Sequence, residues 1–125
     1  MIRQSLDADS IYADAAQHGS GLTALQYRRA KGATTQDIEL NLASPKRLRL
    51  EKRGDTITMF ISTNGEPLHQ VGASIKLHLD GPFYVGLGLC SHNASVVENA
   101  MFSNVELKTL TPDTVSALAL YSTLE

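Results

Sequence analysis

Hydrophobic and polar residues alternate along most of this chain, and turn-forming residues interrupt the alternation roughly every eight to twelve residues. The clearest run covers residues 47–51, in which Leu48 and Leu50 are expected to point inward. The charged residues of this run are expected to point outward: Arg47, Arg49 and Glu51. Asn64-Gly65 is typical of a type I′ hairpin turn, whose two central residues both take positive φ. The pattern predicts an all-β antiparallel sandwich of about eight to ten short strands.

Clusters of Gly, Pro, Asn and Asp separate the strands that this pattern predicts. The predicted strands cover residues 1–5, 22–29, 35–42, 47–51, 56–63, 66–71, 74–79, 83–90 and 101–107. Residues 11–18 fit either a strand or a short helix, because three alanines leave that choice open. Gly86 and Gly88 remove side chains from one face of their strand, so we expect a ligand or another part of the molecule close to that face.

The length of 125 residues suits one domain with a substantial core. We expect a β-sandwich domain over residues 1–110 and a tail or linker over residues 111–125. In that tail, Pro112-Asp113 fits the start of a short helix over residues 115–120, and an extended linker fits equally well.

Composition narrows the class of protein. The chain is 42% hydrophobic and 19% charged, as is usual for a soluble globular domain. A net charge of −2 provides no basic surface, so we expect no nucleic-acid partner. No apolar run approaches the roughly 20 residues of a membrane helix, and no signal peptide is recognisable. Cys90 is the single cysteine, and its apolar setting predicts a buried, unreactive thiol.

Five blocks of sequence, taken in order, resemble one group of domains. They read MIRQSLDADS (residues 1–10), QYR (26–28), LRLEKRGD (48–55), FYVGLGLCSHN (83–93) and ENAMFSNV (98–105). The group is the concanavalin A-like (LamG-like) jelly-roll domains found beside TolB-like β-propellers in bacteria, which are related to the regulation-of-enolase family. The resemblance extends to about residue 107 and implies a concanavalin A-like antiparallel β-sandwich. It also implies a bacterial protein, with both the cytoplasm and the cell envelope open as locations.

The resemblance begins partway through the family's fold. In the family, the block that resembles residues 1–3 follows several earlier strands, and residues 120–125 resemble the lead-in to a propeller. We therefore expect a truncated jelly roll with strand edges and part of its apolar inner face uncovered. Such a sandwich either closes by itself or pairs with another copy, and we favour a homodimer.

Catalytic patterns are weak. The β-glucanases that share this fold resemble one another through a Glu-x-Asp-x-Glu strand, whereas the nearest pattern here is Asp37-Ile-Glu39 with Asn41 in the third place. Ser91, His92 and Glu98 do not fit a catalytic triad, because adjacent strand residues point to opposite faces and no nucleophile elbow is present. We predict no catalytic residues, and a glycoside hydrolase remains the least favoured alternative.

A calcium ion is the one cofactor that the sequence suggests. Asp7 and Asp9 have the spacing of two calcium ligands, but the glycine and the distal glutamate of an EF-hand loop are missing. Aspartates are also frequent in turns for local hydrogen bonding, so we expect a structural turn here. The four histidines do not have the spacing of a zinc site.

Ligand binding is the sharpest functional hypothesis. With Leu25 and Tyr27 facing the core, Gln26 and Arg28 project from the opposite face of their strand. Guanidinium and amide groups suit sugar hydroxyls and carboxylates, although alternating charges are also typical of a solvated face. The candidate ligand-binding residues are Arg3, Gln26, Arg28, Arg49 and His92.

Two functions remain open from the sequence. The first is a non-catalytic, lectin-like module that binds an oligosaccharide or another polyhydroxylated ligand. The second is a structural or protein-interaction domain that self-associates or accompanies a β-propeller.

Overall fold

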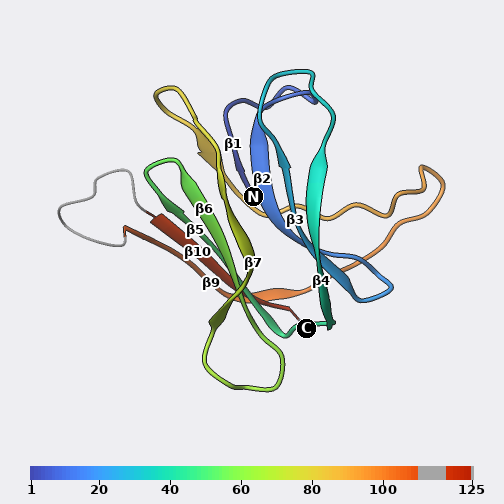
Figure 1. The fold of residues 1–125 in the computed structure, drawn as a ribbon. Coiled ribbons are helices and arrows are strands. Elements are labelled where there is room, and N and C mark those ends of the chain that lie inside the picture. The colour runs from blue at the N-terminus through green and yellow to red at the C-terminus, as the bar shows by residue number, and fades with distance from the viewer. Residues whose placement is uncertain (110–117, 125) are drawn as a thin grey trace.

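Ten strands and no helix make up the described part of the computed structural model, which comprises residues 1–109 and 118–124. The strands form two antiparallel five-stranded sheets, so the all-β prediction is confirmed (Figure 1). The first sheet has the order β4-β3-β2-β1-β8 and the second the order β7-β6-β5-β10-β9.

The first sheet consists of β1 (Ile2–Arg3), β2 (Tyr12–Gln17), β3 (Leu22–Arg28), β4 (Gln36–Ala43) and β8 (Tyr84–Val85). The second sheet consists of β5 (Arg47–Arg53), β6 (Thr56–Ser62), β7 (His69–Lys76), β9 (Phe102–Thr109) and β10 (Leu118–Leu124). The ambiguous segment 11–18 is therefore a strand, because its residues alternate between the core and the outer face of the first sheet.

The hydrophobic core lies between the two sheets. Ile2 and Leu25 enter it from the first sheet, and Ile57, Met59 and Ile61 enter it from the second, each with at most 2% of its surface exposed. Each aliphatic side chain of this size stabilises the fold by roughly 1.5–3 kcal/mol when it is buried. The core therefore fixes the inward face of β1, β3 and β6.

The predicted inward faces of β3 and β5 are confirmed, since Leu25, Leu48 and Leu50 are buried. Glu51 lies on the outer face of β5, yet it is not exposed to solvent as an outward-pointing charge usually is. Only 5% of its surface is exposed. Its carboxylate accepts hydrogen bonds from the guanidinium groups of Arg49 and Arg53. These two neighbours cover Glu51 and balance its charge.

The predicted type I′ turn at Asn64-Gly65 is wrong. Gly65 has a φ of 86°, but it is the one residue of the pair with positive φ, and β6 and β7 are joined by residues 63–68. The Glu66 carboxylate accepts hydrogen bonds from Thr63 N at 2.6 Å and from Asn64 N at 2.7 Å. These bonds lower the pKa of Glu66 to about 2 and stabilise a wider loop than the two-residue turn.

The predicted strand over residues 83–90 is also wrong, because only Tyr84–Val85 forms β8. Among the described strands, β8 pairs with β1. Because β1 is itself two residues long, the pairing stops after two residue pairs. A Cβ atom at Gly86 or Gly88 would meet no described atom within 4 Å, so the space that a side chain would fill at these glycines is open. Cys90 lies beyond the end of β8 and is exposed, which corrects the expectation of a buried thiol.

The expected tail or linker over residues 111–125 contains a strand. Leu118–Leu124 forms β10, which pairs with β5 on one side and β9 on the other. This part of the tail is therefore an internal strand of the second sheet, and its sequence LALYSTL is rich in hydrophobic residues. The remainder of the predicted tail, residues 111–117 and 125, lies outside the described residues.

Candidate functional site

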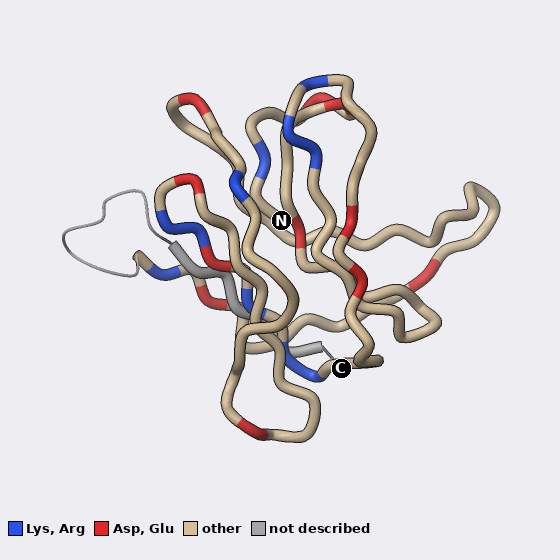
Figure 2. The backbone as a smooth tube through the Cα atoms, viewed as in Figure 1, with Lys and Arg blue, Asp and Glu red and all other residues tan. Residues whose placement is uncertain are grey.

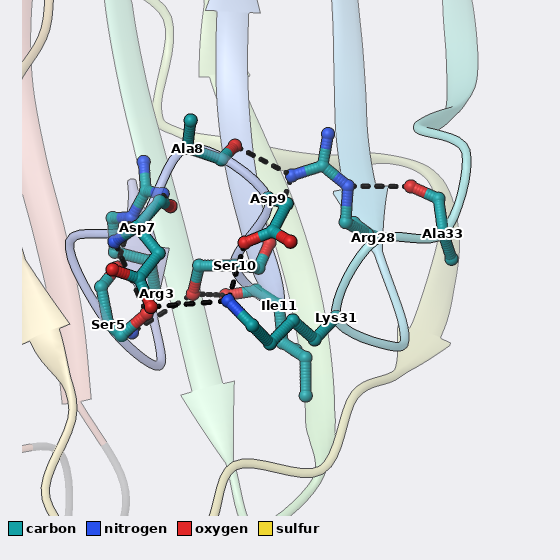
Figure 3. Close-up of polar contacts among 10 residues, drawn as sticks. All are labelled: Arg3, Ser5, Asp7, Ala8, Asp9, Ser10, Ile11, Arg28, Lys31 and Ala33. Carbon is teal, nitrogen blue, oxygen red and sulfur yellow. Dashed lines mark hydrogen bonds and ion pairs between the residues drawn. The ribbon is translucent and has the colours of Figure 1, made fainter.

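Arg28, at the end of β3, ties together two loops at one end of the first sheet (Figure 3). Its Nε donates a hydrogen bond to the Ala33 carbonyl at 2.7 Å, and its Nη1 donates to the carbonyls of Ala8 at 3.2 Å and Ser10 at 3.1 Å. Its Nη2 donates to Thr35 Oγ1 at 3.2 Å. The guanidinium fork is thus occupied by the protein's own acceptors.

Arg3, in β1, holds the same end of the sheet. Its Nε donates a hydrogen bond to the Ser5 carbonyl at 2.5 Å, and its Nη2 donates to the Asp7 carbonyl. Ser10, 1% exposed, accepts a hydrogen bond from Ser5 N at 2.9 Å and donates one to the Ile11 carbonyl at 2.9 Å. Arg3 and Arg28 therefore shape the loop of residues 4–11 from both sides.

Lys31 lies where the sequence suggested a calcium ion. Its ammonium group is 3.2 Å from Asp7 Oδ2 and 2.6 Å from Asp9 Oδ1 (Figure 3). The hydrogen bond from Lys31 to Asp9, together with the attraction of their charges, lowers the pKa of Asp9 and raises the pKa of Lys31. The two aspartates thus have a cation supplied by the chain itself, and no cluster of three metal-ligating side chains occurs within the described residues.

Gln26 and His92 lie at a second place on the outer face of the first sheet. Gln26 Nε2 is 3.4 Å from His18 Nε2, and the His18 ring stacks on the His92 ring with centroids 6.3 Å apart and an interplanar angle of 13°. His92 has a φ of 58°, which turns the chain at the corner that the sequence predicted. His18 was not among the predicted site residues, because only the β2–β3 register brings it to Gln26.

Asp14 lies beside Gln26 in the β2–β3 register and was also missed from the sequence. Its Oδ1 is buried and has no hydrogen-bond partner among the described residues. Burial raises the pKa of Asp14 to about 6, and the positive charges of the Met1 amino group and His18 partly oppose this shift. Asp14 is therefore a carboxyl group whose proton is retained at unusually high pH.

Arg49 does not share a face with the other predicted ligand residues, which corrects that part of the hypothesis. It belongs to β5 in the second sheet, whereas Arg3, Gln26 and Arg28 belong to the first. The separation follows from strand pairing, since β5 pairs with β6 and β10. Arg49 lies over the Phe60 ring, 4.6 Å from its centroid, and pairs with Glu51.

The rejected catalytic candidates are exposed in the structure or bonded elsewhere. Asp37 and Glu39 are exposed residues of β4. The Ser91 hydroxyl donates its hydrogen bond to the Asn93 carbonyl at 2.8 Å rather than to His92. Neither pair forms a nucleophile–base contact.

The two sheets are packed closely at one side of the sandwich. At that side β4 contacts β7, and a Cβ at Gly72 would meet Leu40 at 3.2 Å and Ile38 at 3.3 Å. The middle strands β2 and β5 also contact each other, so the two sheets lie with their strand orders in the same direction. The last strands of the two orders, β8 and β9, therefore lie together on the side opposite β4 and β7. We call β8 and β9 together the open edge.

Exposed apolar side chains are frequent from β8 to β9 along the chain, both on these two strands and on the segment 86–101 that joins them. Of the ten large hydrophobic residues that are exposed within the described residues, eight lie between residues 84 and 107. They are Tyr84, Leu87, Leu89, Val96, Val97, Met101, Val105 and Leu107. Glu98 is the sole charged residue of the segment 86–101, as the tan trace of this segment indicates (Figure 2).

Leu107 is an inner-face residue without cover. It pairs with Leu120, which pairs in turn with the buried Leu50, and paired residues of neighbouring strands lie on the same face of a sheet. Leu107 is nevertheless 60% exposed, and Val105, two residues earlier on the same strand, is 46% exposed. The inner face of the second sheet is therefore uncovered at β9.

Comparison with protein families, with curated proteins and with solved structures found no match to this chain. The site is accordingly interpreted from its own geometry.

Proposed function

We propose that this domain is a protein-interaction module that self-associates through its open edge. The observation that carries the proposal is the 60% exposure of Leu107 on the inner face of a sheet whose equivalent residue Leu50 is 2% exposed. Exposed apolar surface on the inner face of a sheet is typical of an interaction site in a folded protein. Two copies that join their open edges would cover this surface on both.

Edge strands add a second reason. Among the described strands, β9 pairs with β10 and β8 pairs with β1, and each is the last strand of its sheet on the same side of the sandwich. An edge strand offers unpaired backbone N–H and C=O groups, which natural proteins usually cover or pair. Pairing with a second copy satisfies these groups and buries the apolar side chains in one step.

The lectin-like alternative has less support. It requires guanidinium groups that can reach a sugar, whereas those of Arg3 and Arg28 donate to backbone carbonyls of this chain. The relation to concanavalin A-like jelly rolls remains a proposal about the fold, supported by two antiparallel five-stranded sheets.

Sedimentation velocity over a range of concentrations tests the proposed function. We expect a dimer at high micromolar concentration, and we expect Leu107→Asp to shift it to monomer, because a carboxylate would then be buried in an apolar contact. Leu42→Asp is the matched control, since Leu42 is a 42% exposed strand leucine on β4, at the opposite side. A wild-type monomer at high micromolar concentration would refute the proposal, as would equal weakening by both substitutions.

A further inference from the structure

We propose that two copies of this chain pair their β9 strands antiparallel about a two-fold axis through Leu107. This inference rests on the self-association proposed above and specifies its register. Joining the two strands would convert two five-stranded sheets into one continuous sheet across the dimer. In such a symmetric interface, each residue i that faces residue j of the other copy is matched by j facing i.

The regular part of β9 includes Leu107 and follows a bulge. Asn104 has a φ of 51°, and the β9–β10 register shifts in the β10 span from Tyr121 to Thr123, opposite this residue. A bulge of this kind interrupts regular pairing. The uninterrupted pairing therefore covers Glu106–Thr109, which includes Leu107.

The two faces of β9 restrict the axis further. Leu107 lies on the apolar inner face, and Glu106 and Lys108 therefore lie on the outer face. A two-fold axis perpendicular to the sheet keeps the inner faces of both copies on the same side. Paired residues must then belong to the same face, so the axis passes through a residue and not between two residues.

The charges of Glu106 and Lys108 favour one of the remaining pairing registers. With the axis at Leu107, Glu106 of each copy faces Lys108 of the other, so the dimer contains two opposite-charge pairs. An axis at Glu106 or at Lys108 would place like charges directly opposite each other, which destabilises an antiparallel pair. Within one copy, Lys108 Nζ is 3.3 Å from Glu106 Oε2, so both side chains already lie on the same face of the edge.

The Leu107 register also groups the apolar residues. The two Leu107 side chains meet at the axis on the inner face, and Val105 of each copy faces Thr109 of the other. Leu107, 60% exposed on the inner face of one copy, thus becomes the centre of the contact. The kind of partner that fits this edge is thus an identical strand.

A charge-swap experiment tests the register. Glu106→Lys creates Lys–Lys pairs across the two-fold axis, and Lys108→Glu creates Glu–Glu pairs, so each variant alone is expected to raise the dimer dissociation constant roughly tenfold or more at low salt. An equimolar mixture of the two variants makes every cross-strand pair opposite in charge. We expect the mixture to form a heterodimer with an affinity near that of the wild type, as does the double variant Glu106→Lys/Lys108→Glu with itself.

The mixture also serves as the control for folding. Glu106 and Lys108 have 53% and 57% exposed side chains, and a defect within one copy would not be repaired by mixing. If the wild type dimerises and either variant alone dimerises as tightly, the Leu107 register is wrong although self-association stands. If the wild type is monomeric at high micromolar concentration, both this inference and the proposed function fail.

Discussion

Arg28 shows why a residue type alone does not identify a binding site. Its position on the outer face of β3 follows from the alternation of the sequence. Its partners do not, because the carbonyls of Ala8, Ser10 and Ala33 reach it only after the loops around β1 and β3 have folded. A planar guanidinium suits such a fork of backbone acceptors as well as it suits a carboxylate or a sugar.

Asp14 gives a prediction at the same scale. Its pKa in the folded protein is about 6, above the ordinary value of 3.8, so the folded state binds the proton more readily than the unfolded state. Its ionisation therefore lowers the free energy of unfolding as the pH rises from about 4 to about 6, by about 3 kcal/mol at most. Asp14→Asn should remove this fall and be the more stable protein at pH 7.

Urea unfolding at a series of pH values measures this difference. Asp37→Asn, at an exposed position on β4 across β3 from Asp14, controls for the loss of one carboxylate from the same face of the sheet. A difference between the wild type and Asp14→Asn that stays constant from pH 4 to pH 7 would contradict the account of Asp14.

At the scale of the element, long alternating strands were predicted well and strands that depend on a distant partner were not. β3, β5 and β6 follow directly from their own residues, since each has a buried face of its own. β8 is short because its partner β1 is short, and β10 is a strand because β5 and β9 offer it two open edges. Neither cause can be read from the local sequence.

Gly72 lies in β7, the strand that packs against β4 on the side of the sandwich opposite the open edge. It has a φ of 67°, and a Cβ there would press on Leu40 and Ile38 of β4. We expect Gly72→Ala to lower the free energy of unfolding by about 1–3 kcal/mol, because positive φ and a close contact both oppose the new methyl group. Thermal or denaturant unfolding measures the loss.

Gly86→Ala is the matched control for Gly72→Ala. Gly86 has open space around its missing Cβ and does not have positive φ. We expect its replacement to change the stability by less than about 0.5–1 kcal/mol. Equal losses for the two variants would show that close packing of β4 against β7 does not set the geometry of this side.

At the scale of the whole molecule, the sandwich is closed on the β4–β7 side and uncovered on the β8–β9 side. The sequence predicted an all-β fold and an incompletely covered inner face, and it suggested a second copy as the cover. It did not locate the uncovered surface, because the exposure of Leu107 depends on which strands pack opposite β9. The proposed ligand-binding face of Arg3, Gln26, Arg28 and Arg49 is divided between the two sheets, because strand pairing places β5 with Arg49 in the second sheet.

Hydrogen–deuterium exchange at two protein concentrations tests the self-association through β9 most directly. Amides of an edge strand exchange more slowly when a second strand pairs with them. We predict that the amides of Val105–Thr109 exchange more slowly at high micromolar than at low micromolar concentration, while those of β7, the edge at the other end of the same sheet, do not change. Exchange of β9 that is identical at both concentrations would contradict the account.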